Sequence, residues 1–337
     1  MATDVHCHYV PPQYLHYIAA HESSFGMRWN WLDDERARLD AAGMSFAMCR
    51  DFVEADRHLH EMDRLGIRKR VLSLATPLIN YRAEGAVAIE GARLVNEELA
   101  KLKATHPERF DAWAYLPMQA PEESAGELER AVRELGLCGG HVSSNVLGRY
   151  LDDPAFDVVF ATAAGLDVPL FVHPSNPPGQ DRLGKYELAV VGGYLFDTTL
   201  NIFNMIFGGL LDRHPQLRLC CTHAGGYALL LHGRVQREVD TNRELAARIT
   251  RPVVEYLRTL YFDTVCLEAN YLAYAIRVVG RDRFLLGSDA PFPLGEPDPV
   301  AFVRSACQDP GVVERILSGN AEAMRSPGGS RRQAGRG

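Results

Sequence analysis

The stretch Asp4-Val5-His6-Cys7-His8 closes a short apolar run near the N-terminus, and we predict this run as the first strand of a parallel sheet. Residues two apart on a strand project to the same side, so both imidazoles should face one way and the Cys7 thiol the other. A pair of histidines in this spacing indicates either two metal ligands or two hydrogen-bonded structural side chains. The choice depends on what the rest of the chain brings to the same place.

Seven further β-rich runs follow, separated by longer segments with apolar residues at three- and four-residue spacing. This alternation produces a parallel sheet with helical crossovers, and eight parallel strands close a barrel. We therefore predict a (β/α)8 TIM barrel of the α/β class. The predicted strands are Ala2 to His6, Arg70 to Ala75, Asp111 to Leu116, Cys138 to Val142, Val168 to His173, Leu217 to His223, Thr259 to Thr264 and Phe284 to Asp289. The predicted helices are Glu84 to Ala104, Glu122 to Leu135, Ala155 to Ala164, Thr198 to Arg213, Ala228 to Glu238 and Ala269 to Val279.

Two segments interrupt this alternation. Val10 to Asp51, a small insertion after the first strand, shows no clear periodicity, and Pro174 to Gly193 is rich in Pro and Gly. Each follows the carboxyl end of a strand, so each should overhang the active-site face of the barrel unless it is inert decoration. We expect residues 1–325 to form a single domain and residues 326–337, which have almost nothing to bury, to form a disordered tail.

The composition is typical of a globular protein that acts on a small molecule. The 337 residues include 36 Lys and Arg against 43 Asp and Glu, and outside the tail they form no basic stripe that would bind nucleic acid. No segment approaches the roughly 18 uninterrupted apolar residues of a membrane span, and we find no export signal. The seven cysteines contain no C-x-x-C pair, which argues against disulfides and against a cysteine zinc site. We therefore expect a cytoplasmic protein.

Three more metal-type side chains fall at the ends of predicted strands. His173 closes the fifth strand, His223 the sixth and Asp289 the eighth. The carboxyl ends of barrel strands form the rim where barrel enzymes place their catalytic groups. Together with His6 and His8, these side chains would suit a catalytic zinc or a similar divalent ion and leave one histidine over. A set of purely structural histidines explains these coincidences less well.

These residues resemble those of the amidohydrolase superfamily, and within it the decarboxylase branch typified by 2-amino-3-carboxymuconate-6-semialdehyde decarboxylase. The resemblance covers nearly the whole chain, and its most specific motif is the long one near the C-terminus. The motifs that carry it are Asp4-Val-His-Cys-His8, the Val172-His173-Pro174 turn, Thr222-His223-Ala-Gly-Gly226, Gly233-Arg234-Val235 and Leu286-Gly-Ser-Asp-Ala-Pro-Phe-Pro-Leu-Gly-Glu296.

The resemblance implies a metal site and its catalytic partner. His6, His8, His173 and Asp289 would bind one divalent metal ion, usually zinc in that family, with manganese as the alternative and with no organic cofactor. His223 would be the acid/base residue, and Asp289 would act beside it at the catalytic centre.

The resemblance also implies two substrate-binding arginines. Arg50 and Arg234 would hold a substrate carboxylate, with Arg234 reaching into the neighbouring subunit's site in a homodimer. Arginine suits this task because its planar fork pairs with both oxygens of a carboxylate. The alternative for each is an ordinary ion pair at a surface or an interface.

The chain departs from the family pattern in two places. Cys138 to Asn145 contains no lysine, whereas binuclear members generally use a carboxylated lysine there, so the resemblance implies a mononuclear site. We interpret His141 in this strand as structural or as a contact to a metal ligand. Ser175-Asn176-Pro177-Pro178 stands where the typical decarboxylase has a tryptophan and an acidic residue, so the resemblance does not fix the exact substrate. We assign no role to His16, His21, His58, His60, His106, His214 and His232.

The leading hypothesis is non-oxidative decarboxylation of a small unsaturated or aromatic carboxylic acid with amino or hydroxy substituents. His223 would move a proton to the carbon that bears the carboxylate, because an imidazole titrates near physiological pH. The alternative is hydrolysis or hydration of a lactone, an amide or an activated double bond, because one barrel site can support both chemistries. A binding protein without catalysis is disfavoured, since every position of the metal set is filled.

Overall fold

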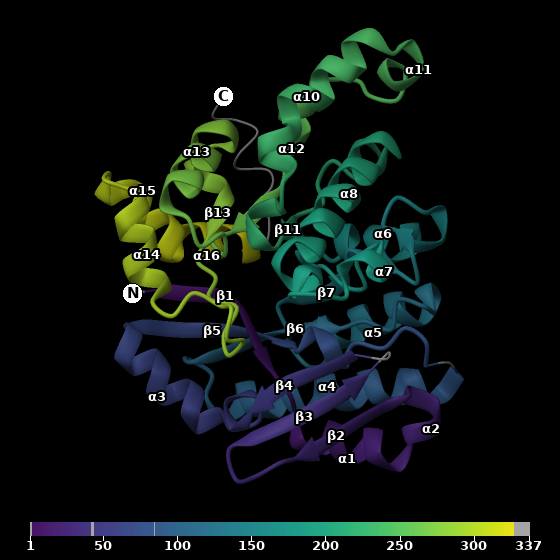
Figure 1. The fold of residues 1–337 in the computed structure, drawn as a ribbon, viewed down its shortest axis with the longest axis vertical. Coiled ribbons are helices and arrows are strands. Elements are labelled where there is room, and N and C mark those ends of the chain that lie inside the picture. The colour runs from purple at the N-terminus through teal and green to yellow at the C-terminus, as the bar shows by residue number, and fades with distance from the viewer. Residues whose placement is uncertain (1, 42–43, 84, 327–337) are drawn as a thin grey trace.

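The computed structural model describes residues 2–41, 44–83 and 85–326, and a barrel of eight parallel strands forms its centre (Figure 1). The strands neighbour one another in chain order, which is the arrangement of a TIM barrel. All eight predicted strands are confirmed. Their bounds are β1 Ala2–Tyr9, β5 Ile67–Leu74, β6 Phe110–Tyr115, β7 Gly139–Ser143, β10 Leu170–His173, β11 Leu219–Cys221, β12 Tyr261–Asp263 and β13 Phe284–Leu285.

The barrel closes where the chain after β13 returns to β1. Cys7 pairs with Ala290 in an isolated parallel bridge, and the amide of Val5 donates to the carbonyl of Leu286 at 2.9 Å. The amide of Asp289 in turn donates to the carbonyl of His6 at 2.8 Å. The first and last strands of the barrel therefore meet, and the two motifs richest in metal-type side chains lie next to each other.

Large apolar side chains fill the barrel interior. Trp113 and Phe171 stack with ring centroids 5.5 Å apart, and the Trp113 indole donates to the carbonyl of Val5 at 3.0 Å across the barrel. Layers of this kind are the usual filling of a TIM barrel. The His6 ring lies 5.1 Å from Phe171, so this cluster is the floor of the site described below. Its buried members are Val5, Val71, Trp113, Phe171, Cys220, Tyr261, Leu285, Ala321 and Met324.

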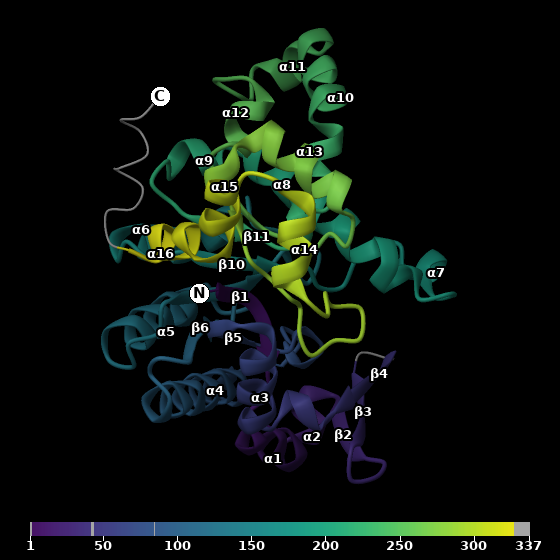
Figure 2. The ribbon, with the colours of Figure 1, turned by 90° about the vertical axis from the view of Figure 1, so that its left-hand side faces the viewer.

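Helices cover the outside of the barrel (Figure 2). In the longest, α4, Ala88, Ala92, Val95 and Leu99 are buried at three- and four-residue spacing, which places one stripe of the helix against the sheet. The predicted helices are confirmed, although Glu84 lies outside the described residues and the fourth prediction divides into α8 and α9. The helices are α3 Ala55–Leu65, α4 Gly85–Thr105, α5 Pro121–Arg133, α6 Asp157–Gly165, α8 Tyr194–Phe207, α9 Leu210–Arg213, α10 Ala228–Thr241, α11 Arg243–Ala246, α12 Val253–Leu257, α13 Ala269–Val279, α14 Pro299–Ala306, α15 Pro310–Glu314 and α16 Asn320–Arg325.

The insertion after β1 is folded. Its three-stranded antiparallel sheet has the order β2-β3-β4, and Leu39 in the middle strand is fully buried. Figures 1 and 2 both place this sheet at the opposite end of the molecule from α10 and α11. The elements of the insertion are α1 Pro12–Ala20, α2 Glu22–Phe25, β2 Met27–Trp31, β3 Arg36–Ala41 and β4 Met44–Cys49.

Short elements complete the description. β8 Asn145–Val146 and β9 Arg149–Tyr150 form a two-stranded antiparallel pair after β7, and α7 Gln180–Leu183 lies in the second interrupting segment. Apart from Ser326, the tail predicted at 326–337 lies outside the described residues. In the part of the chain that is described, no helix is both long and apolar enough to cross a membrane.

Candidate metal centre and its catalytic partner

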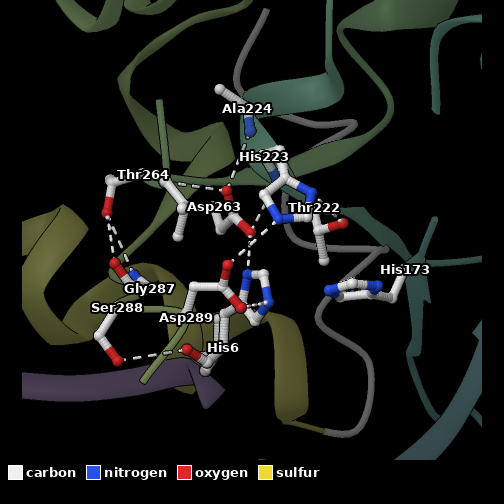
Figure 3. A network of polar contacts seen from close by, with 12 residues as sticks. His6, His173, Thr222, His223, Ala224, Asp263, Thr264, Gly287, Ser288 and Asp289 are labelled. Atoms are coloured by element: carbon white, nitrogen blue, oxygen red, sulfur yellow. Dashed lines mark hydrogen bonds and ion pairs between the residues drawn. The ribbon is translucent and has the colours of Figure 1, made fainter. Parts of the chain in front are cut away.

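Four buried side chains converge at the carboxyl end of the barrel. His6 and His8 belong to β1, His173 ends β10, and Asp289 follows β13. Figure 3 shows His6, His173 and Asp289 of this set. One ligand atom of each of the four residues lies within 4.8 Å of the others. The Nε2 atoms of His6 and His8 are 3.2 Å apart, and Asp289 Oδ1 lies 3.1 and 2.9 Å from them. The structure brings together the four residues expected to bind the metal.

In both β1 histidines, the nitrogen that faces away from the centre is Nδ1, and each Nδ1 has a hydrogen-bond acceptor. His6 Nδ1 lies 2.6 Å from Asp263 Oδ2, and because a carboxylate only accepts, Nδ1 carries the proton. Ser73 donates its hydroxyl to the carbonyl of Cys7 at 3.1 Å and therefore accepts a hydrogen bond from His8 Nδ1 at 3.0 Å. In both rings the Nε2 lone pair is left to face the centre, which is the tautomer that a metal ligand needs.

His173 reaches the same state by a different contact. Its Nδ1 donates to the carbonyl of Pro174 at 2.9 Å and lies 3.0 Å from the hydroxyl of Thr76. Its Nε2 is buried and has no hydrogen-bond partner among the described residues. A buried acceptor without a partner is costly, and a cation at the centre would satisfy it. The donor set of three imidazoles and one carboxylate therefore fits a single divalent metal ion.

The electrostatics of the centre also favour a cation. Burial opposes a charge on His6, but the carboxylates of Asp289 and Asp263 outweigh it and raise the pKa of His6 to about 10. Burial, together with the neighbouring imidazoles, holds the pKa of His173 well below its usual value. Although burial opposes ionisation of Asp289, His6 and its other histidine contacts keep the pKa of that carboxyl well below its usual range. A positive charge is thus favoured next to Asp289, either as a second proton on His6 or as a metal ion that takes the place of that proton and binds Nε2. His173 stays neutral and can offer its lone pair to the ion.

Asp263 is the residue of this site that sequence reasoning missed. It ends β12, is fully buried, and accepts from the amides of His223 at 3.0 Å and Ala224 at 2.9 Å besides its contact with His6. Burial alone would raise its pKa, but the contacts with His6 outweigh burial and lower it. The signal was present in the chain, because a carboxylate at the end of the seventh predicted strand must reach the same rim as the other ligands. One carboxylate thus holds both a metal-type histidine and the backbone of His223.

Replacing Asp263 with asparagine is expected to lower the affinity of the site for its metal by about 10- to 100-fold. The amide keeps the shape of the side chain but removes the negative charge that increases the basicity of His6. Competition of the apoprotein with a chromophoric chelator measures this affinity. Asp212→Asn is the matched control, because Asp212 also accepts a short hydrogen bond, from Tyr256 at 2.6 Å, but lies on α9. Equal metal affinity in the two variants would contradict this role for Asp263.

His223 lies beside the ligand set on a sharply bent turn. Its Nε2 is 3.5 Å from Asp289 Oδ2, and its Nδ1 is 3.2 Å from the hydroxyl of Thr222. His223 and Ala224 have φ of 53° and 50°, an uncommon left-handed conformation for residues with a Cβ. Strained backbone of this kind persists where the surrounding structure holds it, and it often marks a functional site.

Gly226 makes this turn possible. Its φ is 62°, and a Cβ placed on it would lie 2.1 Å from the carbonyl oxygen of Leu195. Gly226→Ala is therefore expected to destabilise the protein by more than the roughly 1–3 kcal/mol of backbone strain alone. Gly233→Ala, in α10, is the control, because nothing lies within 4 Å of its added Cβ and the change should stabilise the helix by about 0.5–1 kcal/mol. Urea denaturation measures both free energies of unfolding, and a Gly226→Ala protein as stable as wild type would refute the steric argument.

The two arginines expected to bind substrate lie in different surroundings. Arg50 follows β4 in the insertion; its Nε donates to the carbonyl of Asp34, its Nη1 donates to Glu54 at 3.3 Å, and its guanidinium stacks 4.4 Å from the centre of Trp31. Arg234 is exposed on α10. The structure does not bring either side chain into contact with the four converging ligands among the described residues, so their role stays a prediction.

The segment after His173 is held by a buried carboxylate. Asp197 accepts hydrogen bonds from Asn145 at 2.9 Å and from the Tyr150 hydroxyl at 3.1 Å, and it is fully buried. Asn145 also donates to the carbonyl of Ser175, which ties this segment to β8, just after the end of β7. Tyr186 in this segment is 87% exposed.

Comparisons with known proteins agree with the geometry. The sequence model of the amidohydrolase family matches residues 3–324. The 2-amino-3-carboxymuconate-6-semialdehyde decarboxylase of Dictyostelium discoideum is 33% identical to this chain over 80% of the chain and 75% of that protein. The gamma-resorcylate decarboxylase of Polaromonas sp. strain JS666 is 31% identical over 77% of the chain and 85% of that protein.

A solved structure shares the same fold. The dihydroxybenzoic acid decarboxylase of Polaromonas sp. JS666 superposes with a TM-score of 0.77 and 24% identity, covering 96% of each chain. That structure holds manganese and the inhibitor 2-nitroresorcinol. At this identity the likeness establishes the fold alone.

Proposed function

The chain belongs to the amidohydrolase family, and on that premise we propose that it is a metal-dependent, non-oxidative decarboxylase. Its substrate is a small unsaturated or aromatic carboxylic acid with amino or hydroxy substituents. The observation that carries the proposal is the convergence of three Nε2 atoms and Asp289, with His223 beside them. The relatives named above are decarboxylases, and they support carbon dioxide release over the hydrolytic alternative.

The metal would be held by His6, His8, His173 and Asp289. A divalent ion bound there supplies a Lewis acid that polarises a substrate oxygen. Imidazole nitrogen with a single carboxylate suits zinc, which we favour, and manganese, which the related Polaromonas structure holds, is the alternative. Asp263 and Ser73 keep the β1 imidazoles in the tautomer that binds the ion.

His223 is assigned the proton transfer. When the bond to the carboxylate breaks, carbon dioxide leaves and its electron pair stays on the substrate carbon, which must then take up a proton. His223 is only 11% exposed and lies next to Asp289, so it can deliver that proton at the edge of the ligand set without direct competition from bulk water.

We assign the substrate carboxylate to Arg50 and to Arg234 of a second copy of the chain. Arg234 lies on α10, which projects from the barrel in Figure 1. Leu230 on the same helix is 55% exposed. Phe196 on α8, which contacts α10, is 45% exposed, and Val191 just before α8 is 56% exposed. A homodimer that covers these apolar side chains would bring Arg234 toward a neighbouring site.

We place this enzyme in the cytoplasm. All seven cysteines are unpaired, including the buried Cys7, Cys220 and Cys221, and free thiols of this kind are kept reduced there.

One assay panel tests the proposed function. Metal-loaded protein is incubated with amino- and hydroxy-substituted aromatic acids, with lactones and with unsaturated acids, and the products are followed as carbon dioxide and by mass spectrometry. We expect carbon dioxide release from at least one acid and dependence on the metal. Water addition or ring opening without carbon dioxide release would instead assign the chain to the hydrolytic or hydrating alternative.

A further inference from the structure

Unpartnered polar atoms gather on one wall of the metal centre. His141 and Ser143 in β7 are both fully buried. Neither nitrogen of His141 nor the hydroxyl oxygen of Ser143 makes a hydrogen bond among the described residues, although the buried Tyr81 hydroxyl lies beside Ser143 and accepts from its amide at 3.3 Å. The described residues contain twelve buried side-chain nitrogen or oxygen atoms without a hydrogen-bond partner. Four of the twelve lie here: the two nitrogens of His141, the Ser143 hydroxyl oxygen and Nε2 of His173. Such atoms are rare in folded proteins, so a group of them at one place requires an explanation.

The strand register places this wall beside the metal ligands. Ser143 is the β-sheet partner of His173, and His141 is the partner of Phe171. Residues two apart on a strand face the same side, and the His141 ring lies 5.4 Å from Phe171 and 6.1 Å from His173. Both β7 side chains therefore face the barrel interior, one level with His173 and the other with the apolar floor.

The chemistry of this pair selects the group that it can bind. A neutral imidazole offers one donor and one acceptor, and a serine hydroxyl can both donate and accept. Neither carries a charge that would offset the desolvation of a buried carboxylate. The complementary group is itself neutral and both donates and accepts, as a hydroxyl or an amino group does.

We propose that His141 and Ser143 form a substituent subsite, which binds a hydroxyl or amino group of the substrate acid at the wall of the metal centre. The subsite rests on the proposed function, because it assumes that an acid binds at the metal. The subsite gives the enzyme a preference among substrate acids of the same size. It also gives a role to His141, which lies in the strand where binuclear members of the superfamily use a lysine.

The test compares acids that differ in one group. Metal-loaded protein is titrated calorimetrically with 2-, 3- and 4-hydroxybenzoate and with the matching methylbenzoates, and each titration is checked for turnover. In wild type, the hydroxy acid of at least one pair should bind about tenfold more tightly than its methyl partner, because a buried polar pair left without a partner is penalised. In Ser143→Ala and in His141→Phe this preference should fall toward one, with metal content and binding of the methyl acid retained.

Ser124→Ala is the matched control, because the hydroxyl of Ser124 is also buried and unpartnered among the described residues but lies on α5, outside the barrel. It should keep the full preference. Ser143→Thr, which retains a hydroxyl, should restore part of it. A preference unchanged in both β7 variants, or equal binding within every pair in wild type, overturns the subsite alone. Failure of every acid to bind to the metal-loaded protein overturns the subsite and the proposed function together.

Discussion

Changing His173 to alanine is expected to empty the metal centre. His173 is the only one of the four ligands that β10 provides. Its buried Nε2 has no hydrogen-bond partner among the described residues, as expected for an atom whose partner is the metal ion. Two imidazoles and one carboxylate would remain, so the ion would lose one of its three nitrogen donors. Removing a partner of a metal ligand already costs about 10- to 100-fold in affinity, so loss of a ligand should cost more.

Elemental analysis of purified protein measures this prediction as the metal content per chain. His60→Ala is the control, because His60 is exposed on α3 and lies away from the converging ligands. It should keep one metal ion per chain, whereas His173→Ala should keep almost none after dialysis against a weak chelator. A His173→Ala protein that retains stoichiometric metal would remove His173 from the ligand set.

The barrel could be predicted because its strands are strong local signals. Runs such as Leu170–His173 are buried on every residue, as expected for strands covered on both faces, and they appear in the sequence as continuous apolar stretches. The sheet of the insertion was missed because its strands are half-exposed. In Arg36–Ala41 the alternation is real, but two of its three buried side chains are alanines, so the hydrophobic contrast is weak.

Helix α3 was also missed, although its pattern was available. His58, Met62 and Leu65 are buried at four- and three-residue spacing, but His58 is polar, so the apolar stripe is short and not obvious. His58 is buried because it contacts Arg70 at 3.0 Å, and this long-range contact cannot be read from the local sequence.

The metal ligands could be predicted because their positions follow from strand ends, and strand ends in a parallel barrel share one rim. Asp263 obeys the same rule and was overlooked because one carboxylate after two aromatic residues has no motif around it. The two arginines are a different case. The proposed role of Arg50 depends on side-chain orientation and that of Arg234 on a second copy of the chain, and neither can be derived from periodicity.

His223→Asn is expected to retain the metal and to lose about 10²- to 10⁴-fold in turnover, the usual contribution of a positioned proton donor. Asparagine is the informative replacement because it tolerates the left-handed conformation that His223 adopts, with φ of 53°, better than most residues. Its amide can still hydrogen-bond to Asp289 or Thr222, so the local structure should survive. Asparagine cannot take up and release a proton, and only that ability is removed.

The measurement pairs initial rates with metal content for the same preparations. His214→Asn is the matched control, because His214 also contacts a carboxylate, Asp157, at 3.0 Å, but lies at the end of α9. It should leave turnover unchanged. If His223→Asn turned over at close to the wild-type rate with its metal in place, the proton would have to come from another group. The four ligands would then still be assigned to a metal site, but the assignment of His223 as the proton donor would be wrong.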